Sequence, residues 1–97
     1  MNRPNVVVIA NPSAGPSWRR RSPNALAARI EALLGRHHAE GQVRLTDGPG
    51  HARALAQEAL QAGADIVVAW GGDGTINEVA SALMRGPASL GIVPVGS

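Results

Sequence analysis

Residues 66–79 read IVVAWGGDGTINEV, an apolar run that passes through three glycines into a segment with helical spacing. Residues 66–69 are continuously apolar and mostly β-branched, which is typical of a strand buried on both faces of a parallel sheet. Over residues 75–84, apolar side chains recur every three or four positions and predict a helix that begins at Thr75. This stretch therefore predicts a strand, a glycine loop and a helix in direct succession.

The rest of the chain repeats this alternation of strand and helix. Three further strands are predicted over residues 6–10, 43–46 and 90–93. One further helix is predicted to have Ser22 as its N-cap and to end at Gly35, and another to end at Gly63. Such alternation with short loops is typical of right-handed βαβ units. We therefore expect an α/β fold, a three-layer Rossmann-like parallel sheet with helices on both faces.

The loops that follow the strands carry the candidate binding residues. In parallel sheets, ligands gather at the carboxyl ends of the strands, where the loops into the helices converge. Four loops begin there, at Asn11, Thr46, Gly71 and Pro94, and each carries small or polar residues. The sequence therefore predicts a site for a phosphate-bearing ligand at this edge of the sheet.

Length and composition narrow the classes of protein. The 97 residues amount to one small domain, and two Trp with no Phe or Tyr predict an aliphatic core. The chain has no cysteine, so disulfides and thiolate metal sites are excluded and a cytoplasmic location is the default expectation. The apolar run near the start is too short for a signal peptide or a membrane span, so we expect a soluble protein.

The charge of the chain does not predict a nucleic-acid partner. The pI near 11.1 rests on a net charge of only +2, and the nine basic residues are all arginines, most of them scattered. Arg19, Arg20 and Arg21 form the one cluster in the sequence. Solvated side chains are the simpler interpretation of this cluster, and contact with phosphates or with an anionic membrane surface is the alternative.

The loop Gly71-Gly72-Asp73-Gly74-Thr75 leaves a buried strand and opens a helix. Its backbone amides and the positive end of the helix therefore point to the place where an anion would bind. Three glycines let a phosphate approach the backbone closely. The alternative interpretation is a tight turn from strand to helix with no ligand.

Thr75 and Glu78 lie three positions apart at the predicted start of the helix. This spacing is that of a capping box, in which the hydroxyl accepts from the third amide and the carboxylate accepts from the N-cap amide. A phosphate would compete for the same amides, so Thr75 could instead turn toward a ligand. Both interpretations stay open.

Two ring side chains adjoin the predicted site. His51 follows the loop that begins at Thr46 and could reach a nucleotide, although a lone histidine in a turn is usually solvated. Trp70 directly precedes the glycine loop, where we expect it to pack, with stacking on adenine as the alternative.

The glycine loop is neither a P-loop nor a plain dinucleotide site. A P-loop needs a lysine for the β- and γ-phosphates, and the chain has none. The dinucleotide fingerprint has a third glycine where this chain has Asn77, and Asp73 would repel a pyrophosphate. An aspartate beside phosphates fits a Mg²⁺ ion between them, or a carboxylate that accepts a proton from an attacking hydroxyl. Asp73 therefore indicates phosphoryl transfer.

Taken together, these residues resemble the catalytic region shared by diacylglycerol kinases, sphingosine kinases and bacterial lipid kinases. The resemblance spans nearly the whole chain and rests on four motifs in a fixed order. The motifs are Asn11-Pro12-x-Ala14-Gly15, Thr46, Gly71 to Val79, and Pro94-x-Gly96-Ser97. The glycine core alone also occurs in NAD kinases, so the order of all four motifs carries the resemblance. The fold that it implies is that of the N-terminal domain of diacylglycerol and NAD kinases.

The resemblance implies that ATP lies across these loops with Mg²⁺ beside its phosphates. The cofactor-binding positions that it implies are Asn11, Thr46, Gly71, Gly72, Asp73, Gly74, Thr75, Ile76, Asn77, Glu78 and Ser97. Asp73 is the catalytic candidate, because sphingosine kinases assign the proton-accepting role to the matching position. Bacterial relatives assign the base to a glutamate much further along, so proximity to Mg²⁺ and the γ-phosphate is the safer inference for Asp73.

The resemblance also implies a reaction for a complete enzyme, the transfer of the γ-phosphoryl group of ATP to a lipid hydroxyl such as that of diacylglycerol, in phospholipid synthesis. Pro16-Ser17 stands where many relatives have glycine or lysine, which would weaken phosphate contact there. The family motif continues past Ser97 into a β-rich domain that holds the lipid, and none of that domain is present. We therefore expect residues 1–97 to be a nucleotide-binding domain that transfers no phosphoryl group to lipid by itself.

Two other functions stay open from the sequence. An NAD kinase-like enzyme would take a nicotinamide nucleotide as acceptor, although Asn11-Pro12 argues against it. A non-catalytic nucleotide-binding module, or a fragment that works with another chain, is the second alternative. The resemblance leaves the lipid acceptor unidentified, and it leaves open both a transient contact with a membrane surface and a homo-oligomer.

Overall fold

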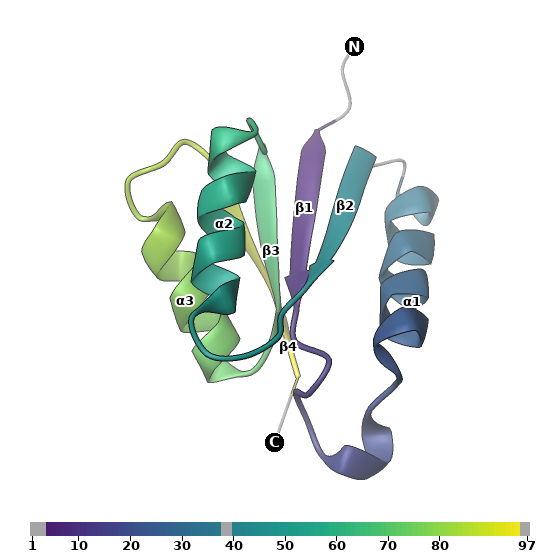
Figure 1. Cartoon of the computed structure of the whole chain (residues 1–97). Helices are drawn as coiled ribbons and strands as arrows, with labels where there is room; N and C mark the ends of the chain where they lie inside the picture. Colours follow the sequence, from purple (N-terminus) through teal and green to yellow (C-terminus); the bar gives the residue numbers. More distant parts are fainter. Residues whose placement is uncertain (1–3, 38–39, 96–97) are drawn as a thin grey trace.

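Strand and helix alternate along the whole described chain, residues 4–37 and 40–95 of a computed structural model (Figure 1). The elements are β1 (Asn5–Ala10), a 3₁₀ turn η1 (Ser17–Arg19), α1 (Pro23–Arg36), β2 (Glu40–Leu45), α2 (His51–Gln61), β3 (Ile66–Gly71), α3 (Asp73–Leu83) and β4 (Ser89–Pro94). The strands form one sheet in the order β2-β1-β3-β4, with every pair parallel. The predicted α/β fold with a parallel sheet is confirmed.

β1 is an inner strand, with β2 on one side and β3 on the other. Val8 lies opposite Val43 of β2 and opposite Val68 of β3. All five residues from Val6 to Ala10 are buried, as a continuous apolar run requires when both faces of a sheet are covered. Because all four strands run in the same direction, their carboxyl ends lie at one edge of the sheet.

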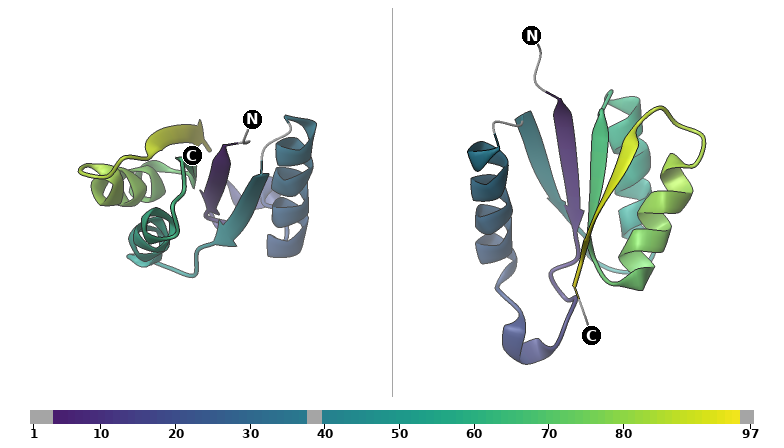
Figure 2. Two further views of the ribbon diagram at one scale, coloured as in Figure 1. Left: turned by 90° about the horizontal axis from the view of Figure 1, so that it is seen from above. Right: turned by 180° about the vertical axis from the view of Figure 1, so that it is seen from behind.

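Helices cover both faces of the sheet, as predicted. α1 lies on one face, and α2 and α3 lie side by side on the other (Figure 2). The side chains of β1 alternate between these faces: Val6, Val8 and Ala10 pack on the side of α1, whereas Val7 and Ile9 pack on the side of α2 and α3. Within the described residues, no helix is long and apolar enough to cross a membrane.

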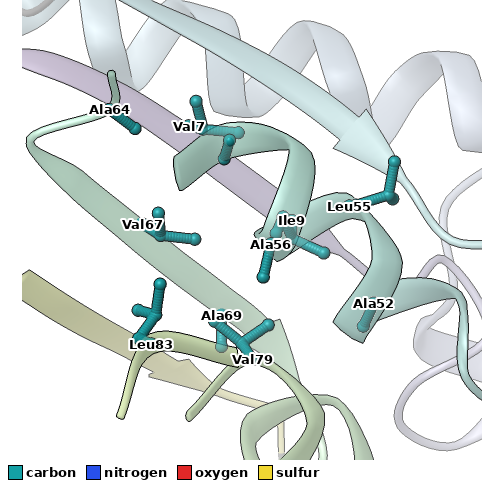
Figure 3. Close-up of a cluster of buried hydrophobic side chains, with 11 residues drawn as sticks. Val7, Ile9, Ala52, Leu55, Ala56, Ala64, Val67, Ala69, Val79 and Leu83 are labelled. Carbon is teal, nitrogen blue, oxygen red and sulfur yellow. The ribbon is translucent and has the colours of Figure 1, made fainter. Parts of the chain in front are cut away.

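The larger core lies between the sheet and the pair α2 and α3 (Figure 3). Its buried members are all aliphatic: Val7, Ile9, Ala52, Leu55, Ala56, Ala59, Ala64, Val67, Ala69, Val79 and Leu83. The small alanine side chains on the inner face of α2 let this helix lie close to the strands. The predicted aliphatic core is therefore confirmed.

The ends of α1 and α2 test the predicted caps. The Ser22 hydroxyl accepts a hydrogen bond from the Ala25 amide at 3.2 Å, which confirms Ser22 as the N-cap of α1. Gly63 follows α2 with a φ of 85°, as predicted for its C-terminus. The prediction that Gly35 ends α1 is wrong, because the helix continues to Arg36. A glycine ends a helix in this way only where it takes a positive φ, and Gly35 does not.

α3 begins two residues earlier than predicted. Gly72 is its N-cap with an extended backbone, and Asp73, not Thr75, is the first helical residue. The capping box of Thr75 and Glu78 is therefore wrong, because Thr75 holds the third position of the helix and is not its N-cap. An acidic residue suits the positive end of a helix, which explains why the helix includes Asp73.

The strands extend past the apolar runs that predicted them. β2 begins at Glu40 and not at residue 43, because its pairing with β1 continues over an exposed polar end. β3 continues to Gly71, which pairs with Pro94 and whose carbonyl accepts from the Val95 amide at 3.0 Å. The ends of these strands are set by backbone pairing, which cannot be read from a hydrophobic pattern.

Gly63→Ala should lower the free energy of unfolding by about 1 kcal/mol, because a residue with a Cβ atom is strained at a φ of 85°. Urea unfolding followed by circular dichroism measures this change. Gly35→Ala is the matched control: this glycine is helical with open space around it, so alanine should keep the stability or raise it by up to about 1 kcal/mol. Equal losses in the two variants would contradict the left-handed turn at Gly63.

Candidate functional site

A hollow of about 440 Å³ lies at the carboxyl edge of the sheet. It is lined by the loops after β1 and β2 and by the first turns of α2 and α3: Asn11, Ser13, Thr46, Asp47, Gly48, Pro49, Ala52, Gly74, Thr75 and Glu78. Next to it, the chain leaves β1 toward α1 on one face of the sheet and leaves β3 toward α3 on the other. Such a divergence between neighbouring parallel strands opens the crevice in which α/β proteins bind their ligands.

Five of the residues singled out from the sequence meet in this hollow. They come from three separate parts of the chain: Asn11, Thr46, Gly74, Thr75 and Glu78. Of the fourth predicted loop, the described residues Pro94 and Val95 do not line the hollow. Three of the four predicted loops therefore contribute described residues to its lining.

The other predicted residues that the structure describes lie outside the lining of the hollow. Gly71 is buried at the end of β3, and Ile76 packs its side chain against the core beneath α3. Asp73 and Asn77 are exposed on α3. Gly72 lies between Gly71 and the helix as the N-cap. Ser97 lies outside the described residues, so its predicted role stays a prediction.

The three glycines of the loop have different reasons to be glycine. A Cβ atom on Gly71 would lie 2.8 Å from the Thr75 Oγ1 atom, so the packing of Thr75 requires a glycine there. A Cβ atom on Gly72 or Gly74 would meet nothing within 4 Å, and neither residue has a positive φ. Among the described residues, packing therefore gives no reason for glycine at positions 72 and 74.

The N-terminus of α3 is open. Gly72 has no side chain to cap the helix, and among residues 4–37 and 40–95 no side chain accepts a hydrogen bond from the amides of the first turn. The first amides of any helix have no partner within the helix itself. Together with the positive end of the helix dipole, these amides form a site where an anion binds favourably.

The N-terminus of α2 is closed by a side chain from α3. The Glu78 carboxylate accepts hydrogen bonds from the Gly50 amide at 3.1 Å and from the Arg53 amide at 3.3 Å. Gly50 takes a φ of 83° as the residue that precedes α2, so a glycine is required at this turn. Glu78 thus caps a neighbouring helix and not its own, and it fixes the loop after β2 against α3.

The loop from β2 to α2 contributes three lining residues that sequence reasoning did not assign: Asp47, Gly48 and Pro49. The Thr46 amide donates to the Ala10 carbonyl at 2.9 Å, which holds the start of this loop beside β1. His51 Nδ1 accepts from the Asp47 amide at 2.9 Å, so this histidine stabilises the turn. The signal for these three residues was their position in the predicted loop that begins at Thr46, at the carboxyl end of a strand.

Asn11 forms the tight turn that follows β1. Its Oδ1 atom accepts from the Ser13 amide at 2.9 Å, and its carbonyl accepts from the Ala14 amide at 3.1 Å. Its own amide donates to the Trp70 carbonyl at 3.0 Å, which joins the turn to β3. The side-chain NH₂ group is then the part of Asn11 that remains to meet a ligand.

Trp70 is a packing residue, as predicted. Its side chain packs against the core on the side of α1, together with Leu26 and Ile30. This is the face of the sheet opposite α3. The indole therefore supports the end of β3 from the face that carries α1.

Comparison with known proteins identifies the family. Residues 5–97 match the family model of the diacylglycerol kinase catalytic domain, so this α/β chain belongs to that family of lipid kinases. A "Probable lipid kinase YegS-like" from Pseudomonas aeruginosa (strain UCBPP-PA14) is 52% identical over 75 residues, which are 75% of this chain and 23% of that protein. Its namesake from Pseudomonas fluorescens is 44% identical over 78 residues, 75% of this chain and 26% of the relative.

A solved structure agrees with these relatives in fold. The crystal structure of a diacylglycerol kinase from Bacillus anthracis str. Sterne superimposes with a TM-score of 0.78 at 26% sequence identity. The superposition covers 99% of this chain and 35% of that one. The predicted resemblance to diacylglycerol kinases is therefore confirmed, and the chain spans about a quarter to a third of the proteins that it matches.

Glu78→Ala should release the amides of Gly50 and Arg53, because it removes the only acceptor that the described residues offer them, and should lower the free energy of unfolding by about 1–2 kcal/mol. Hydrogen exchange at the amides of Gly50 and Arg53 should become faster. The control is Glu58→Ala, which removes an exposed carboxylate paired with Arg44 and should cost less than about 0.5 kcal/mol. If exchange at Gly50 and Arg53 stayed as slow as in the wild type, Glu78 would not be the cap of α2.

Proposed function

We propose that this chain binds ATP at the open N-terminus of α3, as the nucleotide-binding part of a lipid kinase. The observation that carries the proposal is the pair Gly72 and Gly74, because no described residue of the folded chain occupies the space beside them. A phosphate that approaches the backbone would use that space and would bind to the amides of the first turn. The adjacent hollow of about 440 Å³ has room for the rest of a nucleotide.

The two helix N-termini at this edge favour one position for the phosphates. The Glu78 carboxylate already holds the amides of α2, so a second anion there would meet a negative charge. The amides of α3 have no such occupant among the described residues. The phosphates therefore bind at Gly72, Asp73 and Gly74, and the nucleoside extends past Asn11 and Thr46.

The remaining positions implied by the family keep more limited roles in this proposal. Gly71 and Ile76 are turned into the protein, so they contribute through the backbone only. Thr75 lines the hollow, and its hydroxyl faces Gly71. Asn77 is exposed one turn into the helix. Ser97 is assigned to the ATP site by the family resemblance alone.

Mg²⁺ is the metal that this proposal implies, and Asp73 would hold it together with the phosphates. The donor set fits, because Mg²⁺ usually binds one or two carboxylates along with phosphate oxygens and waters. Residues 4–37 and 40–95 contain no group of three or more His, Cys, Asp or Glu that could hold a metal without the nucleotide. The metal would neutralise phosphate charge, and we expect it to bind with ATP and not alone.

The proposed reaction of the complete enzyme is transfer of the γ-phosphoryl group to a lipid hydroxyl. Support for a lipid acceptor comes from the family and from the names of the relatives, which are lipid and diacylglycerol kinases. Asp73 is the proposed catalytic residue of this chain, because its carboxylate is exposed beside the proposed phosphates and could accept the proton of the attacking hydroxyl. The family match over residues 5–97 favours this function over that of an NAD kinase.

A nucleotide-binding module without activity of its own is the second candidate. The chain spans 23% and 26% of the length of two relatives, so residues 1–97 correspond to only part of those proteins. Phosphoryl transfer needs the acceptor held in line with the γ-phosphate, a task that this proposal assigns to no described residue of the hollow. Both candidates require the same ATP site, so binding is the property to test first.

Gly74→Ala should separate ligand binding from folding. A methyl group at this position enters the proposed phosphate site, so the affinity for ATP–Mg²⁺ in calorimetry should fall by about tenfold or more, which is about 1.4 kcal/mol. The same change should keep or raise the stability, because alanine favours a helix more than glycine does. Gly35→Ala, in α1 and far from the hollow, should gain similar stability and keep the full affinity.

The same titration on Asp73→Ala tests the role of Mg²⁺. Loss of the carboxylate should weaken ATP binding when Mg²⁺ is present. When Mg²⁺ is chelated, the same variant should bind ATP more tightly or equally well, because Asp73 then only repels the phosphates.

The proposed ATP site would be wrong if Gly74→Ala bound ATP–Mg²⁺ as tightly as the wild type and Gly35→Ala.

A further inference from the structure

Asp47 brings to the hollow of about 440 Å³ a carboxylate that accepts no hydrogen bond from the described residues. It is the second residue after β2, in the loop that crosses to α2 at the carboxyl edge of the sheet (Figure 1). Its side chain is 93% exposed. Both oxygens of this carboxylate can therefore accept from a ligand.

The backbone of Asp47, in contrast to its side chain, is held in place. Its amide donates a hydrogen bond to the Nδ1 atom of His51 at 2.9 Å. The same nitrogen lies 3.8 Å from the Oδ2 atom of Asp47. Because a ring nitrogen that accepts a hydrogen bond carries no proton, Nδ1 cannot also donate to the carboxylate. His51 thus fixes the position of Asp47 and leaves its carboxylate oxygens without a donor.

The other carboxylate in the lining of the hollow belongs to Glu78, and the fold already uses it. One of its oxygens accepts from the Gly50 amide and the other from the Arg53 amide. The described residues that line the hollow include no third acidic side chain. Asp47 is therefore the carboxylate whose full acceptor capacity remains for a ligand.

The place of Asp47 in the sheet matches the size of a nucleotide. β1 lies between β2 and β3, and neighbouring strands are about 4.8 Å apart, so the ends of β2 and β3 are separated by about 10 Å. The proposed phosphates bind where α3 follows β3, whereas Asp47 follows β2. A span of two strands corresponds to the distance from the terminal phosphates of a nucleotide to its ribose. The sugar then lies on the side of the hollow that Asp47 lines.

We propose that Asp47 accepts hydrogen bonds from the ribose hydroxyls of the bound nucleotide and makes the site selective for ribonucleotides. This role rests on the proposed function, because without a nucleotide at α3 there is no ribose to bind. A ribose presents two neighbouring hydroxyl donors, and a carboxylate presents two oxygens that only accept, so the two groups are complementary. In dinucleotide-binding α/β proteins, an acidic residue beyond the glycine loop binds a ribose hydroxyl in the same way.

The charge of Asp47 argues against a phosphate at this end of the hollow. A phosphate group beside the carboxylate would bring two negative charges together, with no cation from the described lining between them. An uncharged diol avoids this repulsion and still supplies donors. The carboxylate therefore favours the sugar as its partner and disfavours nucleotides that carry a phosphate on the ribose hydroxyls.

Calorimetry with ATP–Mg²⁺ and with 2′,3′-dideoxy-ATP–Mg²⁺, which lacks both hydroxyls, tests the proposal. The wild type should bind ATP about tenfold more tightly, because the hydroxyls donate to a charged acceptor. Asp47→Ala should bind the two nucleotides about equally. The ratio of the two affinities is the quantity to compare, since the loss of one negative charge acts on the phosphates of both nucleotides alike.

Two further variants separate the ribose contact from net charge and from the shape of the loop. Glu40→Ala removes an exposed carboxylate at the amino end of the same strand and should keep the preference for ATP unchanged. Asp47→Asn retains one acceptor oxygen and should keep a smaller preference, about threefold. Both changes at Asp47 keep the amide that donates to His51, so the loop should keep its shape.

Equal affinities of the wild type for ATP and for the dideoxy nucleotide would overturn the role of Asp47 and leave the ATP site standing. A preference that persisted in Asp47→Ala would also overturn it, because another group would then bind the ribose. If the wild type bound neither nucleotide, the ATP site itself would be wrong, and the ribose contact with it.

Discussion

The parallel pairing of β1 with β2 and β3 is the constraint on which the site depends. It brings the carboxyl ends of the strands to one edge, although the loops that follow them begin 35 and 25 residues apart, at positions 11, 46 and 71. The chain leaves β1 and β3 toward opposite faces, and a crevice opens between the two exits. Buried valines on both faces of β1 hold this arrangement, so the loops of the site extend from a strand that is packed on both sides.

The N-termini of α2 and α3 both lie at this edge, and the two helices differ in what binds their first amides. α2 receives a carboxylate from Glu78, which satisfies its amides and joins it to α3. α3 begins after Gly72, and no side chain of the described residues caps its amides. Helix dipoles attract anions at both positions, but only one of them is left for a ligand. This asymmetry, more than the count of glycines, makes the start of α3 the best place for a phosphate.

Much of the fold could be predicted because its signals are local. The buried run of β1, the cap at Ser22 and the left-handed Gly63 each depend on residues within a few positions of one another. The role of Glu78 could not be predicted in this way, because its partner Gly50 lies 28 residues earlier in the chain. The spacing of Thr75 and Glu78 within α3 suggested a capping box, whereas Glu78 in fact caps the start of the neighbouring helix α2.

The candidate site was predicted in outline for the same reason. The edge follows from the alternation of strands and helices, and the glycine loop follows from its motif, so Asn11, Thr46 and Gly74 were found. The lining by Asp47 to Pro49 depends on how the turn after β2 folds against α3, which no local pattern reports. The different reasons for Gly71 and Gly74 also appear only in three dimensions, since one faces Thr75 and the other faces open space.

The central claim is that the phosphates of ATP bind the first amides of α3. Backbone amide shifts in a two-dimensional NMR titration with ATP–Mg²⁺ report on each of these amides directly. We expect the largest shifts on Gly72, Asp73 and Gly74 and smaller ones on Asn11 and Thr46. Almost none is expected at Gly50 and Arg53, because Glu78 already binds their amides. Shifts that centred on the start of α2, or that were absent from the start of α3, would contradict this claim.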